Sequence, residues 1–577
     1  MKKLLIYLKE YKKESVLGPL FKLLEASLEL LVPLVIAAII DNGIANNDKG
    51  YIVKMCLILV TLGIVGLFFS ITAQYYAAKA SAGFVKKIKH ALFKHIGQLS
   101  FSEMDTLGTS TLITRMTSDM NQVYNGINLT LRLLLRSPFV VFGAMIMAFT
   151  IDVKAALLFA VAIPILSVVV FGIMLVCIPL YKKVQARLDK VLGITRGNLT
   201  GVRVIRAFCK EEEEIKEFKN RNEELTAIQK HVGRISALMN PITYVIINLA
   251  IIALLRTGAI RVEAGIITQG AVVALYNYMS QILVELIKLA SLIISITKAV
   301  ACGNRIQGVF EIESSLVEQD TLPKQNPSQY AVEFRHADLR YKNAGANSLT
   351  DMDFVVRHGE TIGIIGGTGS GKSSLVNMIP RFYDATEGAV LIDGIDVKDY
   401  PLEELRDKIG VVPQKAVLFK GTIRDNMRWG KKDATDEEMM EAITVAQAKE
   451  IVAGKENGLD HKIEQGGKNL SGGQKQRFTI ARALVKKPEI LILDDSASAL
   501  DFATDAALRK AIREMAYSPT VFIVSQRASS IQYADKIIVL DDGKVVGIGT
   551  HDELLDTCEV YREIYYSQFK KEEKYHG

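Results

Sequence analysis

Residues 361–374 read TIGIIGGTGSGKSS, a short β-type run that leads into a glycine-rich loop and then into a helix. The spacing is GxxxxGK[ST], from Gly366 to Gly371, Lys372 and Ser373. Glycines let backbone N–H groups close around phosphate oxygens, while the lysine reaches the β- and γ-phosphates and the serine hydroxyl ligates Mg²⁺. The stretch therefore predicts an α/β P-loop domain that binds ATP with Mg²⁺. The candidate phosphate-binding residues are Gly366, Gly367, Thr368, Gly369, Ser370, Gly371, Lys372, Ser373 and Ser374.

The whole chain is too long and too uneven in composition for a single domain. Its 577 residues exceed what one hydrophobic core usually organises. Apolar runs fill roughly the first 300 residues, whereas the remainder has the charge density of a soluble α/β domain. We therefore predict a transmembrane domain over 1–313, a linker over 314–330 and a nucleotide-binding domain over 331–577.

Net charge and cysteine spacing argue against two other classes of protein. The net charge of +7 is mild for this length, and Lys and Arg cluster beside the apolar segments, so no nucleic-acid partner is expected. The five cysteines lie far apart, without CxxC spacing. We therefore expect small hydrophobic side chains or free thiols at these positions, not a metal site or a disulfide framework.

The first domain carries the pattern of a multi-pass membrane protein. A span needs about 20 predominantly apolar residues. Stretches that meet this need lie at residues 16–40, 55–78, 131–150, 154–180, 241–260 and 271–297, which gives an all-α domain of six spans. Lys and Arg concentrate at the N-terminus and in the loops after the second and fourth spans. This bias places both termini and the nucleotide-binding domain in the cytosol.

The two long cytosolic loops keep helical periodicity, so we expect helices that project beyond the membrane. Each loop has a short break, near residues 106–111 and 207–211. Two interpretations stay open. The breaks dock on a cytosolic domain, or the loops are simply long solvated helices.

Charged residues occur within the predicted spans. Glu285 and Lys288 lie three residues apart in the last span and can pair on one helix face. Such charges usually face a bundle interior or a water-filled path. Two interpretations of Glu285 and Lys288 stay open: they line a translocation pathway, or they form a structural ion pair. The same two interpretations apply to Glu25 and Glu29 of the first span.

Residues 470–474 read LSGGQ and precede the helical segment QRFTIARAL and the hydrophobic-acidic run ILILDD. Over its whole length the chain resembles a half-transporter of the ABC exporter family, in which six spans precede an ATP-binding cassette. LSGGQ is the signature of that family. The resemblance implies that these residues contact the γ-phosphate across a dimer interface: Leu470, Ser471, Gly472, Gly473 and Gln474.

The same resemblance implies further site residues. Tyr341 is similar to the aromatic residue that stacks on adenine, although a buried strand tyrosine is the alternative. Gln414 is similar to the glutamine that contacts Mg²⁺ or the attacking water and relays the nucleotide state. Asp494 is similar to the Mg²⁺-linked carboxylate, with Ser373 as its partner ligand. Asp501 ends the loop that crosses to the opposite site.

The chain departs from the family pattern at positions that matter for hydrolysis. Asp495 stands where the family has the Glu that orients the attacking water, and Gln526 stands where it has a His. The shorter carboxylate is retracted by about an ångström, a displacement that can cost about a hundredfold in rate. Gln465 lies where the family more often has Glu, so its coupling role is open. A symmetric but slow enzyme, with Asp495 acting through a bridging water, is the alternative.

With Asp495 and Gln526 at these positions, the chain resembles the degenerate-site subunit of bacterial heterodimeric multidrug exporters. The resemblance implies a second half-transporter as partner, a bacterial inner membrane, membrane lipid around the spans, and export of small amphipathic drugs or lipids driven by ATP. In that pairing Asp495, Gln526 and Gln414 form a weak catalytic set, while the intact LSGGQ completes the partner's site.

Two other functions stay open at this point. One is a homodimeric or importer-like transporter of a specific solute such as a peptide or siderophore, for which a path with more ionisable residues would be expected. The other is an ATP-gated regulator with little hydrolysis.

Overall fold

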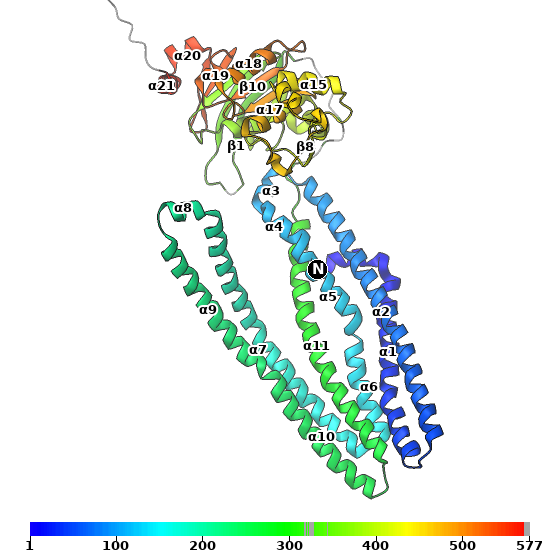
Figure 1. Cartoon of the computed structure of the whole chain (residues 1–577). Helices are drawn as coiled ribbons and strands as arrows, with labels where there is room; N and C mark the ends of the chain where they lie inside the picture. Colours follow the sequence, from blue (N-terminus) through cyan, green and yellow to red (C-terminus); the bar gives the residue numbers. More distant parts are fainter. Residues whose placement is uncertain (317–318, 320, 322–327, 343, 570–577) are drawn as a thin grey trace, which may run out of the picture. The chain divides into compact units, whose positions relative to one another are not determined.

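The computed structural model describes residues 1–316, 319, 321, 328–342 and 344–569. The chain divides into two compact units. The first comprises residues 1–97 and 109–312, and the second comprises residues 98–108 and those from 313 onward (Figure 1). Most of the linker predicted over 314–330 lies outside the described residues.

The first unit is helical throughout. Its elements are η1 (Lys2–Tyr11), α1 (Lys12–Ala38), η2 (Ile39–Ile44), α2 (Lys49–Gln98), α4 (Thr109–Thr114), η3 (Arg115–Asp119), α5 (Met120–Leu133), α6 (Arg136–Ile151), α7 (Val153–Thr200), α8 (Val202–Ala207), α9 (Glu211–Ala237), α10 (Met239–Glu263) and α11 (Gln269–Phe310).

Within the described chain, six helical stretches are long and apolar enough to cross a membrane. Each contains one predicted span, so the prediction of an all-α domain with six spans is confirmed. The stretches are Lys3–Ile44, Lys49–Gln98, Thr109–Ile151, Val153–Thr200, Glu211–Glu263 and Gln269–Phe310. Helix α11 packs against α1, α5, α6, α7 and α10, and its Tyr278 is fully buried. This helix is therefore the centre of the unit.

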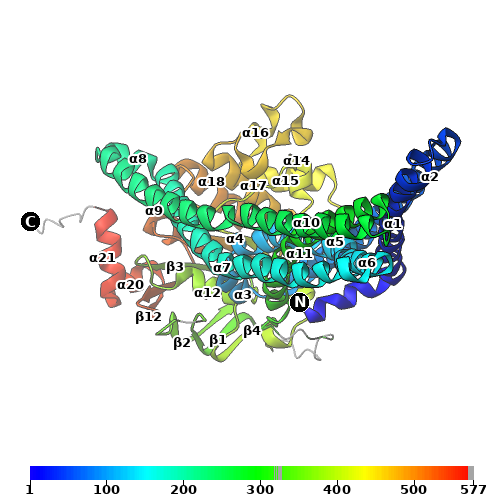
Figure 2. The same ribbon diagram turned by 90° about the horizontal axis from the view of Figure 1, so that it is seen from below.

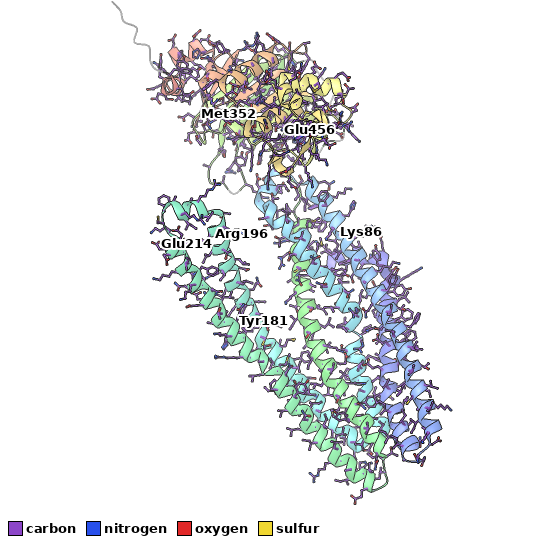
Figure 3. All side chains as sticks on the ribbon, in the orientation of Figure 1. Lys86, Tyr181, Arg196, Glu214, Met352 and Glu456 are labelled. Atoms are coloured by element: carbon purple, nitrogen blue, oxygen red, sulfur yellow. The ribbon has the colours of Figure 1, made fainter. Side chains whose placement is uncertain are left out.

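Helices α7 and α9 run side by side and are joined at their tip by the short helix α8, as Figures 1 and 2 show. Figure 3 marks Tyr181 and Arg196 along α7 and Glu214 near the start of α9. The break predicted at 207–211 is present, because α8 ends at Ala207 and α9 begins at Glu211. The tip exposes large apolar side chains: Leu199, Val202, Val204, Phe208 and Ile215.

The break predicted at 106–111 lies at Gly108, whose φ of 73° ends α3 (Phe101–Leu107). Positive φ is accessible to glycine at little steric cost. Helix α3 belongs to the second unit. There its Phe101 ring lies 4.6 Å from the Phe382 ring, and Tyr383 donates a hydrogen bond to Asp105 at 2.6 Å. Helix α3, which ends at this first break, thus packs on the nucleotide-binding domain of the same chain.

The second unit is an α/β domain. Its strands are β1 (Tyr330–Leu339), β2 (Leu349–Arg357), β3 (Thr361–Gly366), β4 (Glu387–Ile392), β5 (Ile395–Asp396), β6 (Ile409–Val412), β7 (Gly421–Thr422), β8 (Lys462–Ile463), β9 (Ile490–Asp494), β10 (Thr520–Val524), β11 (Lys536–Asp541) and β12 (Lys544–Gly549). Its main helices besides α3 are α12 (Lys372–Met378), α13 (Leu402–Lys408), α14 (Ile423–Met427), α15 (Asp436–Val445), α16 (Lys449–Ala453), α17 (Gly472–Leu484), α18 (Phe502–Arg513), α19 (Ala528–Ile531), α20 (His551–Thr557) and α21 (Glu559–Gln568).

The strands of this unit form two main sheets among the described residues. The central sheet has the order β12-β11-β3-β10-β9-β6, with parallel pairing except between β11 and β12. The second is antiparallel, in the order β2-β1-β4-β5. Strands β3, β9 and β10 are buried, as expected for parallel strands covered on both faces. The prediction of an α/β P-loop domain is confirmed.

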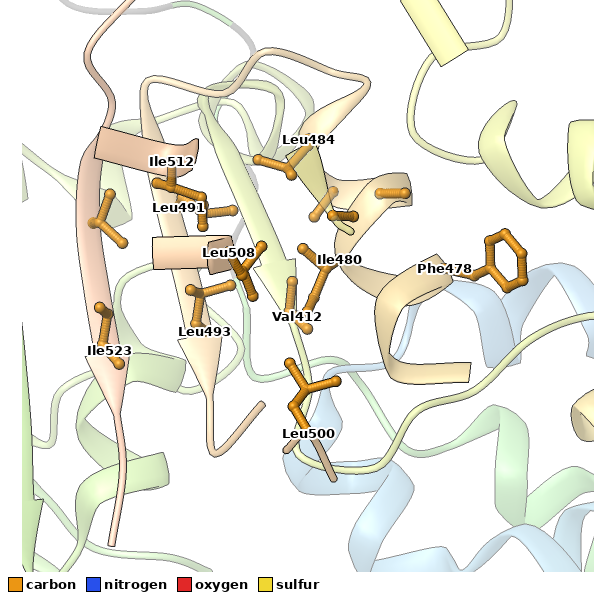
Figure 4. Close-up of a cluster of buried hydrophobic side chains, with 14 of the residues drawn as sticks. Val412, Phe478, Ile480, Leu484, Leu491, Leu493, Leu500, Leu508, Ile512 and Ile523 are labelled. Atoms are coloured by element: carbon orange, nitrogen blue, oxygen red, sulfur yellow. The ribbon is translucent and has the colours of Figure 1, made fainter. Parts of the chain in front are cut away.

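One hydrophobic core joins the central sheet to its helices. Figure 4 shows side chains of α17, α18, β6, β9 and β10 meeting in this cluster, among them Ile480, Leu493 and Leu508. Because β3, β9 and β10 are parallel neighbours, their carboxyl ends meet at one edge of the sheet. Ligands in such folds bind beyond the carboxyl ends of the strands.

Candidate functional site

A pocket of about 600 Å³ lies in the second unit beyond the carboxyl ends of β3, β9 and β10. Its size is within the usual range for small-molecule and cofactor sites. Predicted site residues that line it are Tyr341, Thr368, Gly369, Gly371, Lys372, Ser373, Ser374, Gln414, Asp494, Asp495 and Gln526. The fold therefore brings together residues that are separated by up to 185 positions in the sequence.

The glycine-rich loop runs from β3 to α12 and depends on its glycines. Gly371 has φ 94°, and a Cβ there would lie 2.6 Å from Leu349 Cδ2 and 2.9 Å from the Ser348 carbonyl oxygen. A Cβ at Gly366 would lie only 2.1 Å from the Leu540 carbonyl oxygen. A side chain at either position would push the loop out of place, so the two outer glycines of the motif are steric requirements.

Lys372 begins α12 and folds back over the loop. Its Nζ donates to the carbonyl oxygens of Gly366 at 2.9 Å and Gly367 at 2.6 Å. Burial lowers the Lys372 pKa, although the nearby carboxylates of Asp495 and Asp494 oppose this shift. Its Nζ also donates to the Ser370 hydroxyl at 3.4 Å. A partly buried cation whose hydrogen-bond partners are all neutral is suited to an anionic ligand.

Ser373 and Asp494 form a pair of oxygen ligands. The Ser373 hydroxyl donates to Asp494 Oδ1 at 3.0 Å. Burial raises the Asp494 pKa; the Ser373 hydrogen bond opposes this rise and the neighbouring Asp495 carboxylate adds to it. A nearby cation would offset the cost of ionising Asp494. One carboxylate with a hydroxyl is the kind of partial site that Mg²⁺ uses together with substrate phosphates, so these residues fit that ion.

Asp495 follows β9 in a left-handed backbone conformation, with φ 45°. Its N–H donates to the Val524 carbonyl oxygen at 3.0 Å, which ties it to the end of β10. Its Oδ2 accepts a hydrogen bond from Gln414 Nε2 at 3.3 Å. Asp tolerates this conformation better than most residues. The two predicted catalytic residues Asp495 and Gln414 are therefore in direct contact.

Gln526 is solvent-exposed and lies just beyond β10, between Ser525 and Arg527. The buried Ser525 donates its N–H to the Ile364 carbonyl oxygen at 3.1 Å and accepts the Arg527 N–H at its hydroxyl at 2.9 Å. This turn brings Gln526 to the wall of the pocket.

Tyr341 is half-buried and lies just after β1, not within it. Its hydroxyl forms a hydrogen bond with Ser374 at 2.9 Å, and its ring lies edge-on to Tyr383 at 5.0 Å. The alternative of a buried strand tyrosine therefore does not hold. Tyr341 lines the pocket, so its ring is a candidate for stacking on a base.

The signature residues at 470–474 and Asp501 do not line this pocket. Ser471 and Gln474 form a capping box at the start of α17, in which each side chain accepts a backbone N–H of the other residue. Asp501 caps α18 by accepting the Thr504 N–H at 2.8 Å. These residues therefore lie apart from the phosphate-binding loop's pocket in the same chain.

Sequence reasoning missed one wall of the pocket. It is built from the turn between β1 and β2 and from the turn between β11 and β12, through Asn347, Ser348, Asp542 and Gly543. Gly543 has φ 74°, and its carbonyl oxygen accepts the Thr350 N–H at 2.8 Å. The DDG sequence at 541–543 signals a tight turn, but nothing in it indicates that the turn lies beside the glycine-rich loop.

Replacing Lys372 tests this pocket. We expect Lys372→Ala to weaken ATP binding about thirtyfold, because a charge-assisted contact to the phosphates is lost from a partly buried site. Equilibrium binding of a fluorescent ATP analogue to the full-length protein would measure the change. Lys398→Ala, in a lysine of the same unit outside the pocket, is the control. An unchanged affinity in Lys372→Ala would contradict the assignment.

A second polar site lies among the membrane helices. Arg136, at the start of α6, donates to Glu285 of α11 and to Glu29 of α1, both at 2.6 Å. Glu285 also accepts hydrogen bonds from Lys288 and Ser137 at 2.8 Å. The predicted Glu285–Lys288 pair is confirmed as one part of an ion-pair network. Sequence reasoning missed Arg136, although an acidic residue at membrane depth normally has a basic partner.

Known proteins resemble this chain over nearly its full length. Residues 15–286 match the family described as ABC transporter transmembrane region, and residues 349–498 match the family described as ABC transporter. The chain is 37% identical over 572 residues to the uncharacterized ABC transporter ATP-binding protein YfiB of Bacillus subtilis, with 99% of each chain covered. It is 29% identical over 556 residues to the ATP-dependent lipid A-core flippase of Desulfotalea psychrophila, covering 93% of this chain and 97% of that protein.

A solved structure, that of a bacterial Atm1-family ABC exporter with ATP bound, has the same fold. Its TM-score to this chain is 0.80 at 22% sequence identity, covering 97% of this chain and 99% of that one. The matched families account for both units, in the order expected for one half of an exporter. The cassette binds ATP, and the six helices make this a multi-pass membrane protein. The chain therefore belongs to the ABC transporter family, as a half-transporter in which a six-helix membrane domain is followed by one ATP-binding cassette.

Proposed function

We propose that this chain is one half of a heterodimeric ATP-driven exporter, in which its own ATP site hydrolyses slowly and its signature motif serves the partner's site. One observation carries the proposal. Asp495, at the position where the family has Glu, already contacts Gln414 at 3.3 Å with a side chain one methylene shorter. A carboxylate placed there is about an ångström short of the position from which Glu would orient the attacking water.

Different residues of the pocket would bind different parts of the nucleotide. Lys372 and the backbone N–H groups of the glycine-rich loop would hold the phosphates, and Tyr341 would stack on the adenine. Ser373 and Asp494 would hold Mg²⁺, with Gln414 beside them. When bound, Mg²⁺ would neutralise charge on the phosphate oxygens. The chain would therefore bind ATP tightly whatever its rate of hydrolysis.

Gln526 supports the same conclusion. Its amide can donate a hydrogen bond toward the γ-phosphate but cannot carry the positive charge that a His can. Electrostatic stabilisation of the developing charge would be weaker, so two independent changes lower the rate at one site. Binding depends on other residues and would survive both changes.

A second half-transporter would supply the fast hydrolysis that this chain's own site lacks. ABC exporters work as dimers, and the signature residues of this chain lie outside its own pocket. The capping box of Ser471 and Gln474 orders the start of α17, so backbone N–H groups there are ready to meet a γ-phosphate from a second chain. A partner with Glu and His at its own site would then hydrolyse ATP at a normal rate.

The substrate would be a small amphipathic compound such as a drug or a lipid. The membrane helices are largely apolar, and the charges described at Arg136 and Glu285 neutralise each other within the bundle. The resemblance to a lipid flippase supports a lipid-like cargo. Both termini and the cassette would face the cytosol of a bacterial cell, with the spans in its inner membrane.

The test is ATPase activity of this chain purified with a co-expressed half-transporter that carries Glu and His at its own site. We expect Asp495→Ala to leave the activity of the complex within about twofold, because the partner's site supplies most of the turnover. Replacing the partner's Glu by Gln is expected to abolish it. Full activity from this chain alone, lost in Asp495→Ala, would instead establish a homodimer in which Asp495 is a working catalytic group.

A further inference from the structure

A side chain from the last described helix holds the backbone on both sides of Arg527. Gln568, at the end of α21, donates its Nε2–H to the Gln526 carbonyl oxygen at 2.7 Å. Its Oε1 accepts the Ala528 N–H at 2.9 Å. One side-chain amide therefore bonds both a backbone carbonyl and a backbone N–H, as the backbone of a neighbouring strand does in a sheet.

We infer that Gln568 is a positioning residue for the ATP site, because it sets where Gln526 lies at the pocket wall. The inference rests on the role proposed for Gln526 beside the γ-phosphate. The Gln526 carbonyl and the Ala528 N–H cannot shift independently while one planar amide holds both. Gln526 lines the pocket, so a backbone fixed at this point limits where its side chain can lie.

Helix α21 provides a rigid support for this amide. Its Tyr561 is fully buried, and the Tyr561 hydroxyl lies 2.7 Å from His551 Nδ1. The Tyr565 ring stacks on Phe569 at 4.7 Å, and His551 lies 4.9 Å from the same Tyr565 ring. The helix also packs against β3 and β11, the strands next to the glycine-rich loop. Gln568 is thus tied to the central sheet although its side chain is exposed.

The same backbone segment reaches a second functional loop. Arg527 lies between the Gln526 carbonyl and the Ala528 N–H that Gln568 holds. Its guanidinium donates to the Leu500 carbonyl oxygen at 3.3 Å and lies 5.0 Å from the Phe502 ring centroid. Leu500 directly precedes Asp501, which ends the loop that the family resemblance places toward the opposite site. Gln568 therefore acts on a segment that connects the pocket wall of this chain to its contact with a partner.

Removing the amide gives a measurable change. We expect Gln568→Ala to lower the single-turnover rate of ATP hydrolysis at this chain's own site roughly fivefold, because small displacements of a catalytic group have large effects on rate. ATP affinity should stay within about twofold, since the contacts of Lys372 and the loop are untouched. The assay uses the full-length protein in a complex whose partner carries Gln in place of its catalytic Glu, in excess over radiolabelled ATP, so that only this chain's site turns over. Ser567→Ala, in the adjacent exposed residue, is the matched control and should behave as wild type.

A double-mutant cycle separates positioning from a general structural effect. If Gln568 acts through the Gln526 side chain, Gln568→Ala should change nothing further in a Gln526→Ala background. A merely structural role would lower the rate by the same factor in both backgrounds. Equal factors, or a Gln568→Ala variant with the wild-type rate, would overturn the inference.

The cycle stays informative if the proposed slow site is incorrect. In that case the wild-type single-turnover rate would be high, which refutes slow hydrolysis, while the dependence of Gln568 on Gln526 would still be tested. A slow wild-type site with equal effects in both backgrounds would refute only the role of Gln568.

Discussion

Asp495→Glu is expected to raise the rate of ATP hydrolysis at this chain's own site about a hundredfold, because it restores the missing methylene. The present carboxylate is drawn toward Gln414, and its backbone is tied to the end of β10 through the Val524 carbonyl. A longer side chain at this point extends into the space where the water must lie. The affinity for ATP should be unchanged, since the groups that hold the phosphates are elsewhere in the pocket.

The measurement requires that only this site turns over. Single-turnover hydrolysis would be followed in a complex whose partner carries Gln in place of its own catalytic Glu. Asp495→Asn is the matched control, since it keeps the length of the side chain but cannot act as a base, and should show no gain. Adding Gln526→His to Asp495→Glu should raise the rate further. A variant no faster than wild type would mean that carboxylate length does not limit hydrolysis at this site.

Arg136→Met is expected to destabilise the membrane domain by about 3 kcal/mol, because it leaves Glu285 as a buried charge without its main partner. Both side chains are almost completely buried, with 7% of Arg136 and 4% of Glu285 exposed. Ser137 and Lys288 still contact Glu285, which places the cost at the low end of the usual range. Thermal unfolding of the detergent-solubilised protein would measure the loss.

A second variant distinguishes the broken pair from loss of packing. Arg136→Met combined with Glu285→Gln removes both charges, and should recover most of the stability, since replacing a whole buried pair is far less costly than breaking it. Lys288→Met is the control, because 44% of the Lys288 side chain is exposed and its loss should matter little. If the double variant is as unstable as the single one, the effect comes from side-chain shape and not from charge.

The order of the domains and the binding loop could be read from local patterns. The motif at 366–373 dictates its own conformation, because Gly371 occupies a backbone region that other residues avoid. Spans depend on length and hydropathy, both of which are properties of the sequence alone. Asp494, Gln414 and Gln526 were assigned to one site from the family resemblance. The structure gives the physical reason, because these residues lie at or just beyond the carboxyl ends of the parallel strands β9, β6 and β10.

Other parts of the two sites depend on tertiary packing and carry no local signal. Ser348 and Gly543 meet the glycine-rich loop only because two turns of different sheets happen to face it. Arg136 pairs with Glu29 and Glu285, which are 107 and 149 positions away in the sequence and come from two other helices. Gln568 lies 42 positions from Gln526, on a helix that was not predicted to reach the pocket. No pattern of neighbouring residues encodes such contacts.

The exposed tip of the α7–α8–α9 hairpin also bears on how the cell makes this protein. Leu199 and Phe208 are 75% and 71% exposed there, among other exposed apolar side chains, and such patches mark interaction sites or aggregation-prone surfaces. Chaperones and proteases recognise such patches on unassembled subunits. An unassembled copy would present this patch to chaperones and proteases, so its survival in the cell would depend on how quickly the patch is covered.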